Sequence, residues 1–204
     1  NGATDPQCRV RVNCHAVPGL WQYEALAFKP GMVMRWFRDG FCQYEVAEAA
    51  RTGRDPYDLM NEQAEKIPAG SYGMLCCFSD VMNFINWKHA SPTFTNFHLE
   101  PEKFNRYTFY RAILENTALI VRGHIELVKE ATGHEPDELI FAGGAAKSPL
   151  WCQIVADVTG KPVKVPVVKE ATALGAAILA GYGVGLYPSI EEGVQQTVKL
   201  DRRF

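Results

Sequence analysis

The sequence predicts an α/β fold in which short strands alternate with helices, and three stretches carry this prediction. Residues 139–142 form an apolar run that ends at two glycines, and apolar side chains return at helical spacing over residues 150–158. A strand, a tight turn and a helix are therefore expected there. Residues 162–166 predict a short strand bounded by prolines, and residues 170–181 predict a helix rich in small side chains.

The composition is that of an ordinary globular protein. The chain has 204 residues, of which 47% are hydrophobic and 22% charged, with a net charge of −2, which suits one or two domains with a good core. The absence of a basic run argues against a nucleic-acid surface. The most apolar stretch, residues 171–187, is short and broken by glycines, which argues against a membrane span. With no visible signal peptide and no C-x-x-C spacing among its six cysteines, the sequence predicts a cytoplasmic protein.

The first forty residues predict a β-hairpin followed by an amphipathic helix. Residues 8–14 alternate between polar and apolar side chains, and residues 21–26 follow as a second strand after a short loop that contains proline and glycine. Residues 31–39 carry apolar side chains at helical spacing. The side chains expected to point inward from this helix are those of Val33, Trp36 and Phe37.

The next sixty residues predict two helices, a strand and a long irregular segment. Residues 42–66 are helical in pattern, with Asp55 as the cap and Pro56 as the first position of the second helix. The charged residues of this region are expected on a solvated face. Residues 73–78 predict a buried strand. Residues 79–100 have no clean period, and a loop of this length is often functional.

The longest helix is predicted over residues 110–131, where apolar side chains recur every three or four positions. Gly133 is suited to end this helix. His124 lies on the apolar stripe and is expected to be a core histidine with its hydrogen bonds satisfied. Glu115 and Asn116 fall on the opposite side and are candidates for facing a cleft.

The glycine-rich helix after residue 170 is predicted to pack closely on a neighbour. Gly175, Ala176 and Ala180 give it a small face, which would let another backbone approach, and the sheet is the expected partner. A further helix is predicted to begin at residues 189–194.

The two glycines after residue 142 form the candidate binding element. Gly143 and Gly144 lack a Cβ atom, so their backbone is able to adopt positive φ and to approach a ligand closely. Ser148 is suited to cap the following helix, and Pro149 fits its first turn. Exposed N–H groups at such a place favour an anion, which suggests a phosphate or nucleotide contact. A purely structural strand-to-helix turn is the alternative, and the local pattern leaves both open.

Two familiar nucleotide-binding loops are excluded by residue identity. A Walker A loop needs glycines where this chain has Phe141 and Ala146, so only Lys147 and Ser148 fit its pattern. The residues that follow Gly143 do not form a Gly-x-Gly-x-x-Gly fingerprint. A Rossmann dehydrogenase domain is therefore not supported.

Three blocks in a fixed order resemble the C-terminal half of the FGGY carbohydrate kinases, which include glycerol, xylulose and gluconate kinases. The blocks are residues 143–151 (Gly-Gly-Ala-Ala-Lys-Ser-Pro-Leu-Trp), 156–160 (Ala-Asp-Val-Thr-Gly) and 170–177 (Glu-Ala-Thr-Ala-Leu-Gly-Ala-Ala). The resemblance extends over residues 8–192. Residues 79–92 depart from the acidic-Arg-Thr-Pro motif of pentulose kinases and resemble the autoinducer-2 kinase branch of the family.

The resemblance implies an actin-like ATPase fold of the ribonuclease H-like type, a mixed sheet with helices on both faces. In the family two such domains flank a cleft, and ATP binds between them with its adenosine on the C-terminal domain. Gly143, Gly144 and Ala145 would then lie along the α-phosphate and adenine. Ser148 would stand where glycerol kinases have an asparagine near the base. Lys147 is a candidate phosphate ligand, with a solvent-facing role as the alternative.

The residues that perform phosphoryl transfer in this family are not found in the sequence. The family has an N-terminal phosphate-binding loop and a separate aspartate that acts as the base, and the context of Asp5 matches neither. We therefore expect residues 1–204 to be a fragment, the C-terminal nucleotide-side domain of a larger kinase. It is expected to contain no catalytic residue and no metal ligand, and to be inactive without the N-terminal sugar-binding domain.

The resemblance implies a parent enzyme that uses ATP and Mg²⁺ to phosphorylate a terminal hydroxyl of a small sugar-like molecule. For the autoinducer-2 kinase branch this molecule is the precursor dihydroxypentanedione, and the role is the processing of a quorum-sensing signal. A xylulose-type pentulose kinase and a nonenzymatic nucleotide-binding module are the alternatives. The expected partners are the sugar-like substrate and the N-terminal domain, a homodimer is left open, and neither nucleic acid nor membrane is expected.

Overall fold

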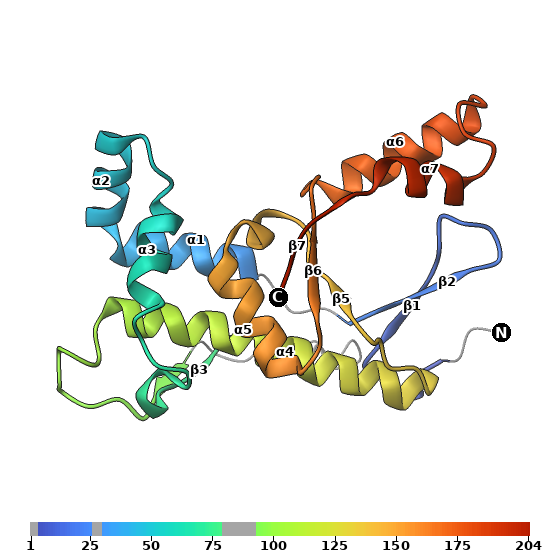
Figure 1. The fold of residues 1–204 in the computed structure, drawn as a ribbon. Coiled ribbons are helices and arrows are strands. Elements are labelled where there is room, and N and C mark those ends of the chain that lie inside the picture. The colour runs from blue at the N-terminus through green and yellow to red at the C-terminus, as the bar shows by residue number, and fades with distance from the viewer. Residues whose placement is uncertain (1–3, 26–29, 79–92) are drawn as a thin grey trace.

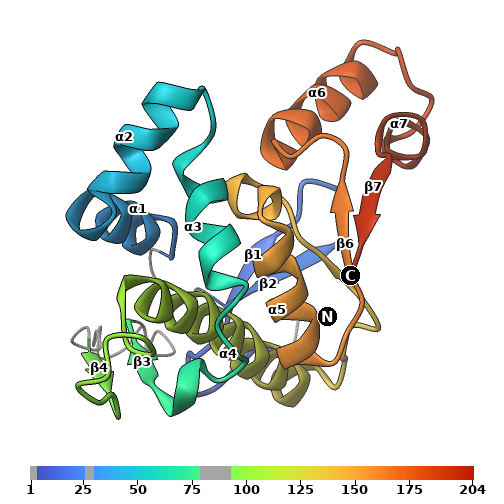
Figure 2. The same ribbon diagram turned by 60° about the vertical axis from the view of Figure 1, so that its left-hand side comes forward.

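The structure is a computed structural model that describes residues 4–25, 30–78 and 93–204. Figure 1 and Figure 2 show a long helix, α4 (Arg106–Thr132), along which the other elements are arranged. A group of three shorter helices lies toward its N-terminal end, and a β-hairpin lies toward its C-terminal end. An α/β unit formed by the last third of the chain packs against its middle.

The N-terminal hairpin is confirmed. Strands β1 (Arg11–Cys14) and β2 (Trp21–Glu24) pair antiparallel, each shorter than predicted. An ion pair joins the start of the hairpin to the far end of α4, because Arg9 Nη1 lies 3.0 Å from a carboxylate oxygen of Glu130. Arg9 also binds Asp5, which folds the preceding residues against the same region.

Helix α1 (Pro30–Phe41) confirms the predicted helix, and of its predicted inward side chains Phe37 is buried and Val33 packs partly buried against the core. Met34 and Phe37 are buried, whereas Trp36 is 49% exposed, so its predicted inward position is wrong. Successive residues of an α-helix are rotated by roughly 100°, and a face centred on Met34 and Phe37 therefore turns Trp36 away from the core. The ring of Trp36 instead lies 5.7 Å from that of Phe78.

Helices α2 (Gln43–Thr52) and α3 (Pro56–Ala64) confirm the two predicted helices and the predicted cap. Asp55 Oδ1 accepts a hydrogen bond from the backbone N–H of Tyr57 at 2.8 Å, which satisfies one of the free donors at the start of α3. The proline at the first position of α3 has no N–H to satisfy.

A buried carboxylate joins α2 to α4. Glu45 is 2% exposed, and its Oε1 accepts hydrogen bonds from Arg106 Nη2 at 2.7 Å and from the Tyr107 hydroxyl at 2.5 Å. Burial by itself raises the pKa of Glu45, but the hydrogen bonds from Arg106 and Tyr107 outweigh it and leave the pKa below its usual value. The prediction that the charges of this region form a solvated face is therefore wrong for Glu45.

The strand predicted over residues 73–78 is present, but its side chains are not all buried as predicted. Strand β3 (Leu75–Cys77) pairs antiparallel with β4 (Thr93–Thr95), which was not predicted. Leu75 is 63% exposed, so the expected burial is wrong at that position. Residues 79–92 of the predicted functional loop lie outside the described residues.

Glu115 and Asn116, the candidates for facing a cleft, hold the segment around β3. Glu115 accepts hydrogen bonds from the N–H of Gly70 at 3.0 Å and the hydroxyl of Ser71 at 2.8 Å. Asn116 Oδ1 accepts from the N–H of Phe78 at 3.3 Å. Both side chains therefore satisfy backbone or hydroxyl donors of an irregular segment.

Helix α4 begins and ends at conventional caps. Asn105 Oδ1 accepts from the N–H of Tyr107 at 3.0 Å, and Gly133 adopts a φ of 72°, as predicted for its C-terminal cap. His124 is buried, but its Nε2 has no hydrogen-bond partner in the described structure, so the expectation of a fully satisfied core histidine is wrong. Burial lowers the pKa of His124, which favours the neutral ring.

The last third of the chain contains a three-stranded mixed sheet. Strand β6 (Val163–Pro166) lies between β5 (Leu139–Ile140), with which it is parallel, and β7 (Leu200–Arg203), with which it is antiparallel. The chain passes from β5 to β6 through helix α5 (Pro149–Thr159). Strand β7 was not predicted, because a sequence of one leucine and three charged residues has no apolar alternation.

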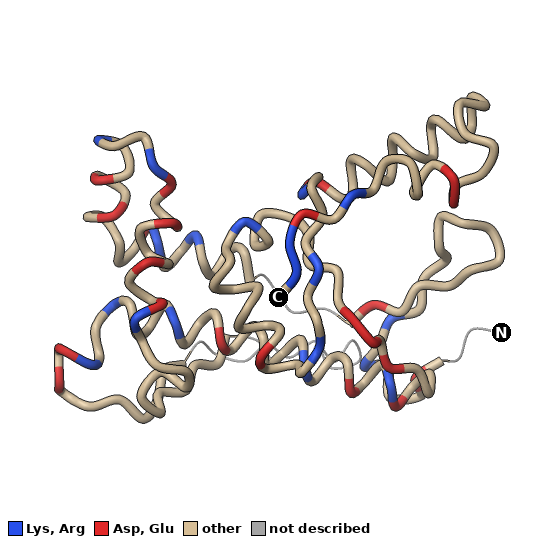
Figure 3. The backbone as a smooth tube through the Cα atoms, in the orientation of Figure 1, with Lys and Arg blue, Asp and Glu red and all other residues tan. Residues whose placement is uncertain are grey.

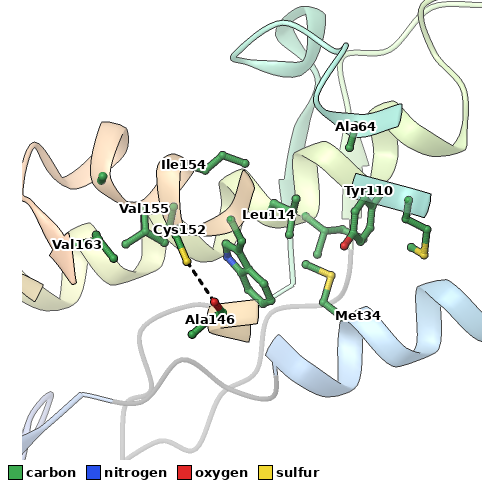
Figure 4. Packing of buried hydrophobic residues seen from close by; sticks show 14 of the residues in the cluster. Met34, Ala64, Tyr110, Leu114, Ala146, Cys152, Ile154, Val155 and Val163 are labelled. Atoms are coloured by element: carbon green, nitrogen blue, oxygen red, sulfur yellow. Dashed lines mark hydrogen bonds between the residues drawn. The ribbon is translucent and has the colours of Figure 1, made fainter. Parts of the chain in front are cut away.

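The core forms where α5 packs against α4 and the sheet. Figure 4 shows side chains of α5 beside Leu114 of α4, and Met34 of α1 close to Tyr110. Val163 of β6 is fully buried against the same cluster. One core therefore connects the helices of the first half of the chain to the sheet of the second.

Helices α6 (Ala171–Gly183) and α7 (Ile190–Thr197) pack on each other through glycines other than the predicted ones. A Cβ atom on Gly181 would lie 2.6 Å from the Tyr187 ring, and one on Gly193 would lie 2.9 Å from Ile178. The predicted small face of α6 is not used, since Gly175 has open space around it and its companions Ala176 and Ala180 are exposed.

Charged side chains are spread over most of the fold. Figure 3 shows Lys and Arg interspersed with Asp and Glu along the helices. None of the helices in the described ranges has the length and hydropathy to cross a membrane. Within those ranges there is also no group of three or more His, Cys, Asp or Glu side chains placed to hold a metal ion.

We expect the substitution Arg106→Ala to lower the free energy of unfolding by about 2 kcal/mol, because it leaves the buried Glu45 carboxylate without its cationic donor. Arg51→Ala is the control, since Arg51 pairs with Glu48 on the exposed side of α2, and we expect a loss of at most about 0.5 kcal/mol. Urea denaturation of both variants measures the difference. Equal losses would contradict a structural role for the buried pair.

Candidate functional site

The turn after β5 depends on an unusual backbone conformation at Gly143. Its φ of 83° and ψ of −171° fall in a region that essentially only glycine occupies. The N–H of Gly143 donates to the carbonyl oxygen of Lys169 at 2.8 Å, which fixes the turn to the segment after β6. Gly144 has no positive φ, so the need for a glycine conformation holds at Gly143 alone.

A short 3-10 turn, η2 (Gly144–Lys147), separates β5 from α5, which agrees with the predicted tight turn between the strand and a helix that begins at Pro149. The N–H of Ala146 donates back to Gly143, and that of Ser148 donates to Ala145. The N–H groups of Gly144 and Ala145 are used by no hydrogen bond within the described part of the chain. Two neighbouring backbone donors are therefore available at this turn.

Ser148 caps α5, as predicted. Its hydroxyl oxygen accepts the N–H of Trp151 at 3.2 Å, and the residue is only 9% exposed. The indole N–H of Trp151 in turn donates to Thr117 Oγ1 on α4 at 2.8 Å, and its ring meets that of Phe141 edge to face. The first turn of α5 is thus held against α4 by both polar and aromatic contacts.

A cavity of about 430 Å³ opens beside this turn. Its size falls within the range of sites that bind small molecules. The walls come from the N-terminal parts of α1 and α3, the middle of α4, the end of β5, and η2 with the start of α5. The lining residues are Pro30, Gly31, Met34, Asp55, Tyr57, Asp58, Asn61, Tyr110, Thr117, Val121, Phe141, Gly144, Ala145, Lys147, Ser148, Trp151 and Val155.

The structure brings three of the four predicted site residues to this wall. Gly144, Ala145 and Ser148 line the cavity, together with Lys147. Gly143 is not a lining residue, and it shapes the path of the chain into the wall.

The cavity offers acceptors from one set of elements and donors from another. On α3 and α4, the hydroxyl of Tyr110 donates to Asn61 Oδ1 at 3.0 Å. Asp55 and Asp58, at the start of α3, also line the cavity and supply carboxylate acceptors. Burial raises the pKa of Tyr110, so its hydroxyl stays protonated and able to donate. On η2, the free N–H groups and the Lys147 side chain supply donors. The rest of the lining is largely apolar.

Sequence reasoning missed the contribution of α1 and α3 to the site. Both helices and α5 begin at the cavity, and each has a proline in its first turn, Pro30, Pro56 and Pro149. The N-terminal end of a helix carries a partial positive charge, so three such ends raise the potential around the cavity. The only sequence signal for this arrangement is that three helices begin with a proline. No residue near any of these prolines indicates that the three helix N-termini meet at one cavity.

We expect Gly143→Ala to lower the free energy of unfolding by about 1–3 kcal/mol, because alanine is strained at this φ and ψ. Gly144→Ala is the matched control next to it. An added Cβ there meets no atom within 4 Å and the backbone is unstrained, so we expect a change of less than about 1 kcal/mol. Thermal unfolding of the two variants tests the contrast, and a similar cost for both would rule out strain at Gly143 as the cause.

Two curated relatives match nearly the whole chain. The autoinducer-2 kinase of Yersinia enterocolitica is 49% identical over 201 residues, and that of Yersinia pestis is 48% identical over 200 residues. Each alignment covers 98% of this chain and 38% of the relative. The chain therefore spans little more than a third of the length of these relatives.

Solved structures show the same fold. The xylulose kinase of Rhodospirillum rubrum is 27% identical with a TM-score of 0.74, over 98% of this chain and 38% of that structure. The glycerol kinase of Plasmodium falciparum, solved with ADP, is 20% identical with a TM-score of 0.65, over 86% of this chain and 32% of that structure. The predicted α/β fold of the actin-like ATPase type is thereby confirmed.

The family model for the C-terminal domain of these kinases matches residues 3–184, which include the glycine turn, the capped helix α5 and all the lining residues of the cavity. The resemblance recognised from the three sequence blocks is confirmed by this match and by the curated relatives. The chain belongs to the FGGY family of carbohydrate kinases, in the part of it that forms the C-terminal domain.

Proposed function

We propose that this chain is the nucleotide-side domain of an ATP-dependent carbohydrate kinase and that ATP binds in the cavity beside η2. The observation that supports this most directly is that Gly144, Ala145 and Ser148, chosen from the sequence alone, line one cavity of about 430 Å³. A space of this volume accommodates an adenosine group. In this proposal Gly143 shapes the turn from outside the cavity.

The wall chemistry fits the two ends of a nucleotide. The free N–H groups of Gly144 and Ala145 are suited to donate to phosphate oxygens, and the Lys147 ammonium on the same wall adds positive charge. Ser148 already accepts the Trp151 N–H, so its hydroxyl proton is free to donate to the ligand. The apolar part of the lining, which includes Met34, suits the faces of a base.

The proposed kinase also uses Mg²⁺, whose protein ligands we place outside this chain. Among the described residues there is no carboxylate cluster of the kind that holds a metal ion. When bound, Mg²⁺ neutralises charge on the transferred phosphoryl group. We propose that its protein contacts, the catalytic base and the sugar site lie on an N-terminal domain, in agreement with relatives that are more than twice as long.

For the substrate we propose the autoinducer-2 precursor dihydroxypentanedione, phosphorylated at its terminal hydroxyl. The support is the identity of 48–49% to proteins named autoinducer-2 kinases. The 27% identity to a xylulose kinase keeps a pentulose as the second candidate. Residues 79–92 differ from the pentulose kinase motif, and we propose that this segment contributes to the choice of substrate.

We expect the full-length enzyme to transfer the γ-phosphoryl group of ATP to dihydroxypentanedione in preference to xylulose or glycerol. Phosphorus NMR with the three acceptors offered side by side measures this directly. Preference for xylulose would replace the proposed substrate but keep the nucleotide site. An enzyme that binds ATP and transfers phosphate to none of them would favour a nonenzymatic nucleotide-binding module.

The placement of ATP is tested separately by Gly144→Val. Because a side chain at this position projects into open space on the cavity wall, we expect at least a roughly tenfold weaker ATP affinity with little change in sugar binding. Gly175→Val, on α6, is the control, because Gly175 is not a lining residue and an added Cβ there meets no atom within 4 Å. Isothermal titration with ATP measures both variants, and an unchanged affinity in folded Gly144→Val would show that the nucleotide lies elsewhere.

A further inference from the structure

Two neighbouring side chains of β7 are linked to the glycine turn without lining the cavity, Arg202 directly and Asp201 through Lys169. Figure 2 shows β7 as the outer strand of the sheet, with β6 between it and α5. Arg202 Nη2 nevertheless donates a hydrogen bond to the carbonyl oxygen of Ala146 in η2 at 3.1 Å. Asp201 Oδ2 accepts from the Lys169 ammonium at 2.9 Å. The strand that the sequence did not predict is therefore connected to the turn at two places.

The bond from Arg202 satisfies a buried acceptor. Ala146 is fully buried, and the other donor near its carbonyl oxygen in the described structure is the thiol of Cys152 at 3.7 Å, which is a weak donor. A guanidinium group is a strong, charged donor. Pairing of Val165 with Arg202 in the β6–β7 register fixes the backbone from which this side chain extends.

The contact through Asp201 acts on the other end of the turn. The Lys169 ammonium binds Asp201 and also donates to the carbonyl oxygen of Pro166 at 2.9 Å, which folds the segment after β6 around this one charge. The carbonyl oxygen of Lys169 accepts the N–H of Gly143 at 2.8 Å. The position of Gly143 therefore depends on a lysine whose side chain is held by β7.

We propose that Arg202 and Asp201 are positioning residues for the nucleotide, a role that rests on the proposed ATP site. Arg202 holds one end of the turn at Ala146, and Asp201 holds the other end at Gly143 through Lys169. The free N–H groups of Gly144 and Ala145 lie between these ends. Loss of either contact lets the two donors vary in direction. ATP binding then weakens, while binding of the sugar-like substrate and the chemical step stay close to normal.

The test uses the full-length kinase with Arg202→Met, which keeps the apolar stem and removes the donors. Arg203→Met is the matched control, because Arg203 is the next residue of β7, is exposed, and its side chain makes no hydrogen bond or ion pair with the described residues. We expect Arg202→Met to raise the KM and Kd for ATP about tenfold and to leave kcat and the KM for the sugar-like substrate nearly unchanged. The control should leave all four values unchanged.

Two further readouts separate positioning from general stability. Arg202→Lys should recover part of the ATP affinity, since an ammonium group still donates to the Ala146 carbonyl. Amide hydrogen exchange at Gly143 should become faster in Asp201→Asn, with unchanged exchange in the core of α4. Asp201→Asn also carries the affinity test if Arg202→Met does not fold.

The outcomes distinguish this role from the function on which it rests. An unaltered enzyme that fails to bind ATP would overturn the proposed function and this role together. ATP binding that is normal in the unaltered enzyme, in Arg202→Met and in Asp201→Asn would overturn the positioning role alone. A parallel rise in the KM values of both substrates would also overturn it, since that pattern indicates general damage to the fold.

Discussion

The packing of α5 against α4 is the interaction on which the rest of the structure depends. It buries Leu114 from one helix and Cys152 and Val155 from the other, and the hydrogen bond from Trp151 to Thr117 fixes how the two helices are aligned. The sheet, the capped start of α5 and the cavity wall all take their positions from this pair. The cavity lies between this helix pair and the helices α1 and α3 of the first half of the chain.

Features encoded within a few residues were predictable from the sequence. The caps at Asp55, Ser148 and Gly133 follow from local hydrogen-bonding chemistry and from the conformational freedom of glycine, and the structure contains all three. Features that depend on distant partners were not predictable. The sequence of α1 does not reveal which face meets the core, so it predicts Trp36 inward. The sequence around Glu45 predicts an exposed carboxylate, because its partner Arg106 lies 61 residues away.

The same division applies to the candidate site. The glycine turn was found from the sequence, because two glycines between an apolar run and a helix start form a local signal. The opposite walls, with Met34 on α1 and Asn61 on α3, come from segments whose own patterns indicate only ordinary helices. Their convergence is a property of the tertiary fold. The support from Arg202 is hidden for the same reason, in a strand without an apolar pattern.

Because the turn is attached to β7, the formation of the turn is coupled thermodynamically to the pairing of β7 with β6. Residues 143–147 and residues 201–202 are far apart in the chain, so the binding turn is complete only after the last strand has paired with β6. A ligand that favours the completed turn stabilises the paired strand by the same free energy. For the nucleotide site proposed above, occupancy of the site and protection of the sheet edge would thus be two measures of one equilibrium.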